Sequence, residues 1–243
     1  MLTMARLEDY RLITGKGKFT ANIKPSKALV VKFLRTPIAR GNILSIDIST
    51  AKTLPGVVCI FTAEDMASDG ITHMLDTSNP ARDDGGTIVK PRRPILNSYE
   101  IKHLGEPVAM VIAETTEQAD DAIEAINFNY NDSDSAFLSG KDIDSQPVWP
   151  EAHDNCASYH HVGDFSEVEK AEKISAYLIT VPIHISRITA VAMEPRIALC
   201  ETTKKGKSIF TTSTQNPFAL RAEIMQTFSL ETSDIQVIAP DVG

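Results

Sequence analysis

The cysteines are the first candidates for metal or redox chemistry in this chain. Cys59, Cys156 and Cys200 lie far apart and match no disulfide or metal-binding spacing. Cys59 and Cys200 lie within apolar runs, so we expect both to be buried as small hydrophobic residues. The chain therefore carries no cysteine set for an iron–sulfur cluster. A reducing, cytoplasmic compartment fits this use of cysteine.

The histidines and one glutamate are the next candidates. Neither a carboxylate nor a cysteine stands at ligand spacing from His160, His161 or His184, so a linker or strand position is favoured over metal binding. Glu194 lies between Met193 and Pro195. Its carboxylate could position a neighbour, face an active-site channel or pair with an arginine, and we assign it no catalytic role. The candidate arginines are Arg196 and Arg221.

Composition restricts the class of protein that could carry these residues. The chain has 243 residues, with 42% hydrophobic and 23% charged, as expected for a packed globular protein of one or two domains. Its net charge of −8 argues against a nucleic-acid partner. No stretch is long and apolar enough to predict a membrane span, and the N-terminus shows no secretory pattern.

The first half of the chain alternates strand and turn signals. A capping box of Thr115 and Gln118 predicts a helix over 116–126, followed by a strand near 126–130. Residues 69–94 indicate a long surface excursion, and Gly105-Glu106-Pro107 indicates a tight turn shaped by Glu106. Apolar or alternating runs predict strands at 28–34, 43–48, 57–61 and 108–113.

The second half begins with strand signals again. Residues 131–147 lack periodicity and indicate a linker. Asn216 is a candidate N-cap with Pro217 at the first helical position, and Gln215 from its spacing alone caps or precedes that helix. Phe218, Ile224, Met225 and Phe228 would form its apolar stripe. Strands are predicted at 176–185, 197–200, 208–214 and 235–238, with Lys204-Lys205-Gly206 as a hairpin turn.

Short blocks along the whole chain give a resemblance to a known family. In order, they are residues 8–17, 35–40 with 46–47, 54–57 with 62–65, and Gly105-Glu106-Pro107-Val108-Ala109 with 113–115. The series continues with Ala192-Met193-Glu194-Pro195-Arg196, Ser213-Thr214-Gln215-Asn216-Pro217 with Arg221, and 237–243. The chain resembles the large subunits of molybdenum hydroxylases, the xanthine dehydrogenase, aldehyde oxidase and carbon monoxide dehydrogenase large chain family.

The resemblance implies an α+β fold in two parts. Residues 1–135 would form an α/β hammerhead domain, 136–155 a linker, and 156–243 the truncated start of a molybdenum-cofactor-binding α+β domain. Its cofactor site residues here would be Gln215 and Gly243. The Gln215 amide would lie beside the molybdenum without bonding it directly, and a neutral NH₂ donor suits that place. Gly243 would open a glycine-rich stretch.

The same resemblance implies the function. The complete protein would be an oxidoreductase with a molybdenum–pyranopterin cofactor, in the molybdopterin form or its cytosine dinucleotide form. It would hydroxylate an aldehyde or heteroaromatic carbon, or oxidise carbon monoxide, with iron–sulfur and FAD subunits as partners. No catalytic residue falls in this chain, because the family's general-base glutamate lies beyond the C-terminus. We therefore expect the isolated chain to be inactive and to retain no molybdenum.

An alternative from a different class is a non-catalytic module or split-gene piece. Residues 235–243 would then dock with a separate chain that carries the rest of the cofactor site.

Overall fold

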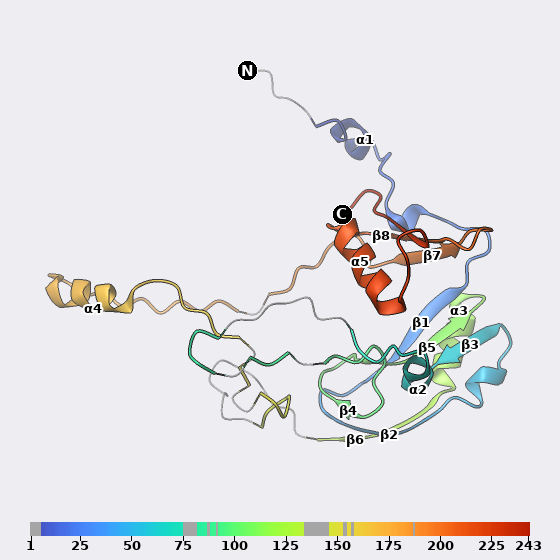
Figure 1. Ribbon diagram of the computed structural model, residues 1–243, viewed down its shortest axis with the longest axis horizontal. Coiled ribbons are helices and arrows are strands. Elements are labelled where there is room, and N and C mark those ends of the chain that lie inside the picture. Colours follow the sequence, from blue (N-terminus) through green and yellow to red (C-terminus); the bar gives the residue numbers. More distant parts are fainter. Residues whose placement is uncertain are drawn as a thin grey trace.

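The computed structural model describes residues 6–74, 82–86, 88–90, 92–133, 146–152, 155–156, 158–186 and 188–243. Its strands form three sheets of three strands each, two in the first half and one in the second (Figure 1). Across the described ranges, no helix has the length and apolar character that crossing a membrane requires. The predicted α+β class is confirmed.

The first half contains two antiparallel sheets. One has the order β1 (Val30–Arg35), β5 (Pro107–Ala113), β3 (Val57–Phe61). The other has the order β4 (Glu100–Ile101), β2 (Gly41–Asp47), β6 (Asn127–Asp132). Each predicted strand of this half is confirmed within two residues.

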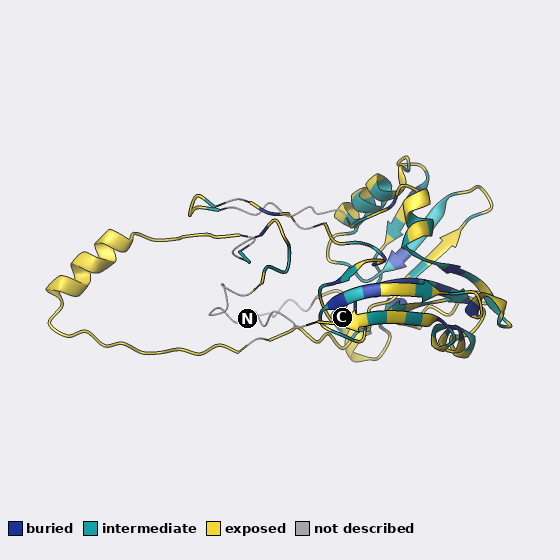
Figure 2. Cartoon of the chain, turned by 90° about the horizontal axis from the view of Figure 1, so that it is seen from below, coloured by how far each residue is buried: buried dark blue, intermediate teal, exposed yellow. Residues whose placement is uncertain are grey.

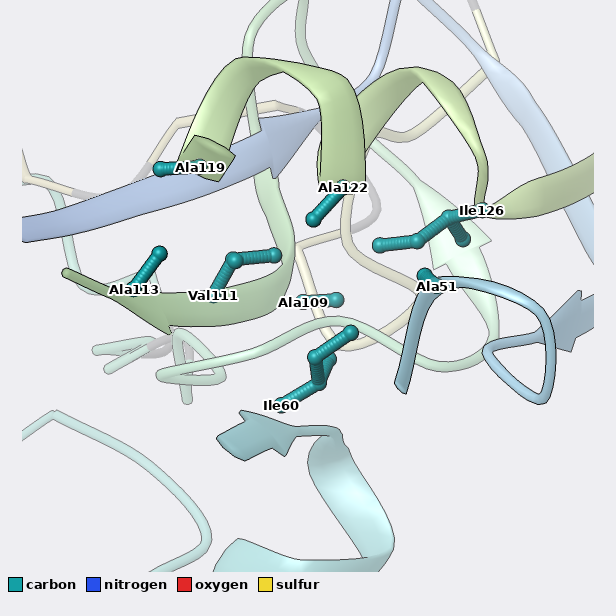
Figure 3. Close-up of a cluster of buried hydrophobic side chains, with 8 residues drawn as sticks. All are labelled: Ala51, Ile60, Ala109, Val111, Ala113, Ala119, Ala122 and Ile126. Carbon is teal, nitrogen blue, oxygen red and sulfur yellow. The ribbon is translucent and has the colours of Figure 1, made fainter. Parts of the chain in front are cut away.

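Helix α3 (Thr116–Glu124) covers the first sheet and closes the main core. The predicted capping box is confirmed: Gln118 N donates to Thr115 Oγ1 at 3.3 Å, and Thr115 N donates to Gln118 Oε1 at 3.1 Å. Figure 3 shows Ala119 and Ala122 of α3 facing the side chains of β5. Two alanines on the buried face let the helix approach the sheet closely. The helix ends two residues earlier than predicted.

The turn before β5 is held by a buried polar network. Glu106 is buried, and its Oε1 lies 2.8 Å from Nδ1 of His103. Its other carboxylate oxygen accepts from Asn97 Nδ2. Its backbone N–H donates to Thr36 Oγ1 at 3.0 Å, and its carbonyl accepts from Thr36 N at 2.9 Å. The prediction that Glu106 shapes this turn is confirmed.

The second half contains the third sheet and one long helix. The sheet has the order β7 (Ala198–Thr202), β8 (Ser208–Thr212), β9 (Ile235–Ile238). The hairpin between β7 and β8 turns at Gly206, which has φ +82°. Helix α5 (Pro217–Phe228) begins as predicted, because Asn216 Oδ1 accepts from Ala219 N at 3.0 Å. Its predicted apolar stripe is only half covered, because Phe218 and Phe228 remain exposed.

Three helices were not predicted. Helix α1 (Asp9–Ile13) and α2 (Ala63–Ser68) span five and six residues, which is too short for a clear apolar period. Helix α4 (Phe165–Ile174) lies at the far end of a long excursion (Figure 1) and buries no residue. It is held by its cap, since Asp164 Oδ1 accepts from Ser166 N and Glu167 N. Short 3₁₀ turns, η1 (Thr20–Asn22) and η2 (Ala51–Thr53), complete the elements of the described residues.

One strand prediction in the second half is wrong. Residues 176–185 form no strand; they run as an extended segment that is exposed on both faces (Figure 2). A strand needs a neighbour for its backbone hydrogen bonds, and no described segment pairs with this one. We call the described residues 176–186 and 188–193 the apolar arm. Its large apolar side chains are between 67% and 101% exposed: Tyr177, Leu178, Ile179, Val181, Ile183, Ile185, Ile188, Val191 and Met193.

The predictions that Cys59 and Cys200 are buried have different outcomes. Cys59 in β3 is half-buried, and burial raises the pKa of its thiol. Cys200 is exposed, so the prediction of a buried residue is wrong. Strand β7 lies at the edge of its sheet, and Cys200 lines an open pocket together with Val31 and Phe33 of β1. Residues 136–145, 153 and 154 of the predicted linker lie outside the described residues.

Candidate functional site

The residues singled out in the second half gather at one end of its sheet. Strands β8 and β9 are parallel, so both end on the same side, and the antiparallel β7 begins there. Gln215 follows the end of β8, Gly243 follows the end of β9, and Glu194 precedes the start of β7. We call this place the carboxyl end of the sheet. Loops at the carboxyl ends of parallel strands are common binding positions.

Glu194 and Gly243 are in direct contact there. The Gly243 N–H donates to Glu194 Oε2 at 2.7 Å. A Cβ atom on Gly243 would lie 2.8 Å from the Cβ atom of Glu194, so the contact requires glycine. Glu194 therefore binds backbone, whereas Arg221, one of its candidate ion-pair partners, donates to the carbonyl of Thr232. Glu194 Oε1 is buried and has no hydrogen-bond partner among the described residues.

Gln215 occupies the turn between β8 and α5. Its side chain is exposed, and the capping of α5 is performed by Asn216 instead. The role in helix capping that spacing alone allowed is thus taken by its neighbour. A second contact joins the end of β8 to the residue before β7: Thr212 Oγ1 donates to the carbonyl of Ile197 at 2.8 Å. The carboxamide of Gln215 is available to a ligand as both donor and acceptor.

A long-range ion pair lies beside this end, and no sequence pattern predicted it. Arg11 donates to both carboxylate oxygens of Asp241, at 2.7 Å from Nη2 to Oδ1 and through a second bond from Nη1 to Oδ2. The Arg11 hydrogen bonds, followed by the N–H of Lys18, lower the pKa of Asp241. The hydrogen bond to Asp241 in turn raises the pKa of Arg11. Both residues lie in blocks singled out above, but their pairing spans the chain.

The histidines lie elsewhere. His160 Nδ1 lies 2.9 Å from Asp83 Oδ2, and His161 N donates to the same oxygen at 3.1 Å. His184 is exposed within the apolar arm. In the part of the chain that the structure describes, no group of three His, Cys, Asp or Glu residues could hold a metal ion.

Two family models match the chain in sequence order. The "Aldehyde oxidase and xanthine dehydrogenase, a/b hammerhead domain" matches residues 14–134, and the "Molybdopterin cofactor-binding domain" matches residues 148–243. Glu194, Gln215 and Gly243 all fall in the second match.

Similar proteins span far more sequence than this chain does. Nicotine 6-hydroxylase large subunit from Paenarthrobacter nicotinovorans is 27% identical over 98% of this chain but only 29% of its own length. Nicotinate dehydrogenase large molybdopterin subunit from Eubacterium barkeri is 22% identical over 98% of this chain and 52% of its own length. The crystal structure of quinoline 2-oxidoreductase from Pseudomonas putida 86 superposes with a TM-score of 0.79 and 26% identity, over 99% of this chain and 30% of that one.

Both halves of the fold, the order of the two family matches and these relatives agree with one another. The chain belongs to the aldehyde oxidase and xanthine dehydrogenase family of molybdopterin-binding large subunits, and it corresponds to an N-terminal hammerhead domain followed by the first part of a molybdopterin-binding domain.

Proposed function

We propose that the carboxyl end of the β7–β8–β9 sheet forms one wall of the cofactor site in a molybdenum-dependent oxidoreductase. The observation that carries the proposal is the exposed carboxamide of Gln215 at the same end of the sheet as the Glu194–Gly243 contact. This wall lies within the match to the molybdopterin-binding domain. The domain division at 1–135 and 156–243 is part of the same proposal.

The residues present fit a cofactor that is held without protein–metal bonds. The NH₂ group of Gln215 would donate a hydrogen bond to the cofactor without adding charge. Gly243 would let the backbone pass close to the cofactor while its N–H stays bound to Glu194, since that contact leaves no room for a side chain. When bound, the molybdenum–pyranopterin group, in its plain or cytosine dinucleotide form, supplies the two-electron redox chemistry. The general base would come from protein outside these residues.

The proposed reaction is hydroxylation of a heteroaromatic or aldehyde carbon, with carbon monoxide oxidation as the remaining possibility. Relatives named for nicotine, nicotinate and quinoline make nitrogen heterocycles the first substrates to test. Electrons would pass to iron–sulfur and FAD subunits, because the chain has only three cysteines and their spacing matches no iron–sulfur cluster. A cytoplasmic location belongs to this proposal and is supported by a cysteine spacing that matches no disulfide pattern.

The experiment compares Gln215→Ala with the unchanged residue in the complete molybdopterin-binding protein. We expect the molybdenum content to stay near one per protein while turnover of a nitrogen heterocycle with a dye acceptor falls ~10- to 100-fold, the range for losing a hydrogen-bonding group around a metal site. Asn216→Ala, which removes the helix cap, is the matched control and should change stability more than turnover. Full turnover in Gln215→Ala would refute the proposed wall.

The isolated chain provides the complementary measurement. The purified 243-residue chain should contain no stoichiometric molybdenum and show no dye-linked oxidation. Stoichiometric metal with turnover would contradict the view that the site needs further protein.

A second candidate is a non-catalytic piece that docks with a separate chain. The apolar arm favours it, because a segment apolar on both faces is typical of a strand buried on both faces. The chain also covers 52% of the relative named a "large molybdopterin subunit", against 29% of the nicotine 6-hydroxylase large subunit. Co-expression with the following reading frame discriminates: a stable complex of two chains supports docking, and a single continuous polypeptide rules it out.

A further inference from the structure

The segment after β9 is bound to the other end of the chain. Asp241 accepts two hydrogen bonds from Arg11 and a third from the Lys18 N–H, at 2.6 Å. Its own N–H donates to the Lys18 carbonyl at 3.0 Å, and Phe19 pairs with Asp241 as a parallel β-bridge. Side chain and backbone of Asp241 are thus both engaged with residues 11–19.

The local sequence explains why Arg11 and Lys18 face the same carboxylate. Helix α1 ends in a Schellman motif, in which Lys16 N donates to the Arg11 carbonyl at 2.9 Å and Gly15 N donates to the Leu12 carbonyl at 3.2 Å. Gly15 takes φ +70°, which an L side chain rarely adopts. The motif reverses the chain after α1, so the backbone of Lys18 comes back beside the side chain of Arg11. Arg11 and Lys18 then bind one carboxylate together.

The geometry of the ion pair fixes more than a charge. The bidentate contact of the Arg11 guanidinium with both oxygens sets the plane of the Asp241 carboxylate. Because Gly243 is held by Glu194 only two residues further on, the segment is fixed from two sides. Pro240 further restricts the backbone between β9 and these contacts.

We propose that Arg11 is a positioning residue of the cofactor site: residues 11–19 hold the Asp241–Gly243 segment at the carboxyl end of the sheet. The segment would then be preorganised before any cofactor binds. This inference rests on the proposed function for its relevance to the cofactor, but the contact itself can be tested in the chain alone.

The first test is amide hydrogen exchange by NMR on the isolated 243-residue chain. Arg11→Gln should lower the protection of the Lys18 and Asp241 amides by about 3- to 10-fold, the range for losing a well-aligned surface ion pair and its hydrogen bond. Asp120→Asn is the matched control, because it removes an ion pair with Lys32 on the hammerhead surface. Unchanged protection in Arg11→Gln would overturn the inference.

A double-mutant cycle removes the ambiguity of a single substitution. Asp241→Asn should lower the same protection, and the double variant Arg11→Gln/Asp241→Asn should be no worse than Asp241→Asn alone. Additive effects would show that the two residues act independently. They too would overturn the inference.

The second test separates positioning from plain stability in the complete, metal-containing protein. Arg11→Gln should alter the electron paramagnetic resonance signal of the reduced metal and lower kcat more than it raises KM, with molybdenum content unchanged. Arg11→Lys keeps the charge but not the bidentate contact, so its resonance signal and its kcat should lie between those of Arg11→Gln and the unchanged protein. An unchanged signal and kcat would sink the positioning role. A complete protein without molybdenum would instead refute the proposed function and leave the exchange result standing.

Discussion

The apolar arm offers a quantitative test of whether this chain is covered by further protein. Ile183 is 80% exposed, whereas Ile101 in β4 is 0% exposed. The same substitution, isoleucine to alanine, can therefore be made at an exposed and a buried position of one chain. Ile183→Ala is the perturbation, and Ile101→Ala is its matched control.

The expected magnitude follows from these exposures. Burying an isoleucine side chain stabilises by about 1.5–3 kcal/mol. If further protein covers the 80% of Ile183 that is exposed here, the substitution should cost about 1–2.5 kcal/mol in the complete protein. In the isolated chain, Ile183→Ala should stay within about 0.5 kcal/mol of the unchanged chain. Ile101→Ala should cost about 2–5 kcal/mol in both, because its site is already closed.

The measurement is the free energy of unfolding in urea, for the isolated chain and for the complete molybdopterin-binding protein. Only Ile183→Ala should change its effect between the two. A cost above about 1 kcal/mol in the isolated chain would show that the arm is already packed. A cost near zero in the complete protein would show that nothing covers it. Either result refutes the reasoning.

Three further predictions concern the cap of α3, the ion pair of Asp241 and the contact between Glu194 and Gly243. Thr115→Ala should lower the free energy of unfolding by about 1 kcal/mol, with a smaller loss for Thr115→Ser, as read from urea denaturation. The pKa of Asp241 is lowered, so its ion pair is fully formed above about pH 4, the ordinary aspartate pKa, and is lost as pH falls through the lowered value. Protection factors of the Lys18 and Asp241 amides should thus be flat from neutral pH to about pH 5 and fall below about pH 4. The nearby charges of Glu8 and Lys18 also act on this ion pair. If Asp241→Asn left the pH dependence of the protection factors unchanged, the assignment to Asp241 would be wrong. Glu194→Gln should keep the Gly243 contact through its carbonyl oxygen but weaken it, so the Gly243 amide should exchange severalfold faster, whereas unaltered exchange would argue against that contact.

Local signals carried most of the successful predictions. Strands β3 and β9 were predicted with the right bounds, because each is a short apolar run closed by turn residues or polar residues. The Thr115 capping box and the Asn216 cap were also confirmed, since both depend on residues within three positions of each other.

The failures have a different physical origin. Residues 176–185 of the apolar arm have the composition of a strand, but no described strand pairs with them. Strand pairing cannot be deduced from one segment alone. Cys200 lies in an apolar run, yet its edge strand leaves it exposed. Helix α4 depends on an N-cap and buries nothing, so no apolar period reveals it.

The candidate site was predictable only in part. Gln215 and Gly243 were singled out by resemblance, and the order of the strands explains why they share one end of a sheet. Their roles toward a cofactor remain predictions. The Glu194–Gly243 and Arg11–Asp241 contacts join residues far apart in the chain, and no local pattern specifies such pairs.

The Arg11–Asp241 contact also has a consequence for the order of events during synthesis. The two residues are 230 positions apart. At a synthesis rate of about 5–20 residues per second, Arg11 waits roughly 10–50 s after its own translation before Asp241 exists. Helix α1 is far too short to stay folded alone during that time. The N-terminal residues therefore lack this contact and stay open to proteases until Asp241 emerges, so a nascent chain that stalls before Asp241 should be trimmed at its N-terminus first.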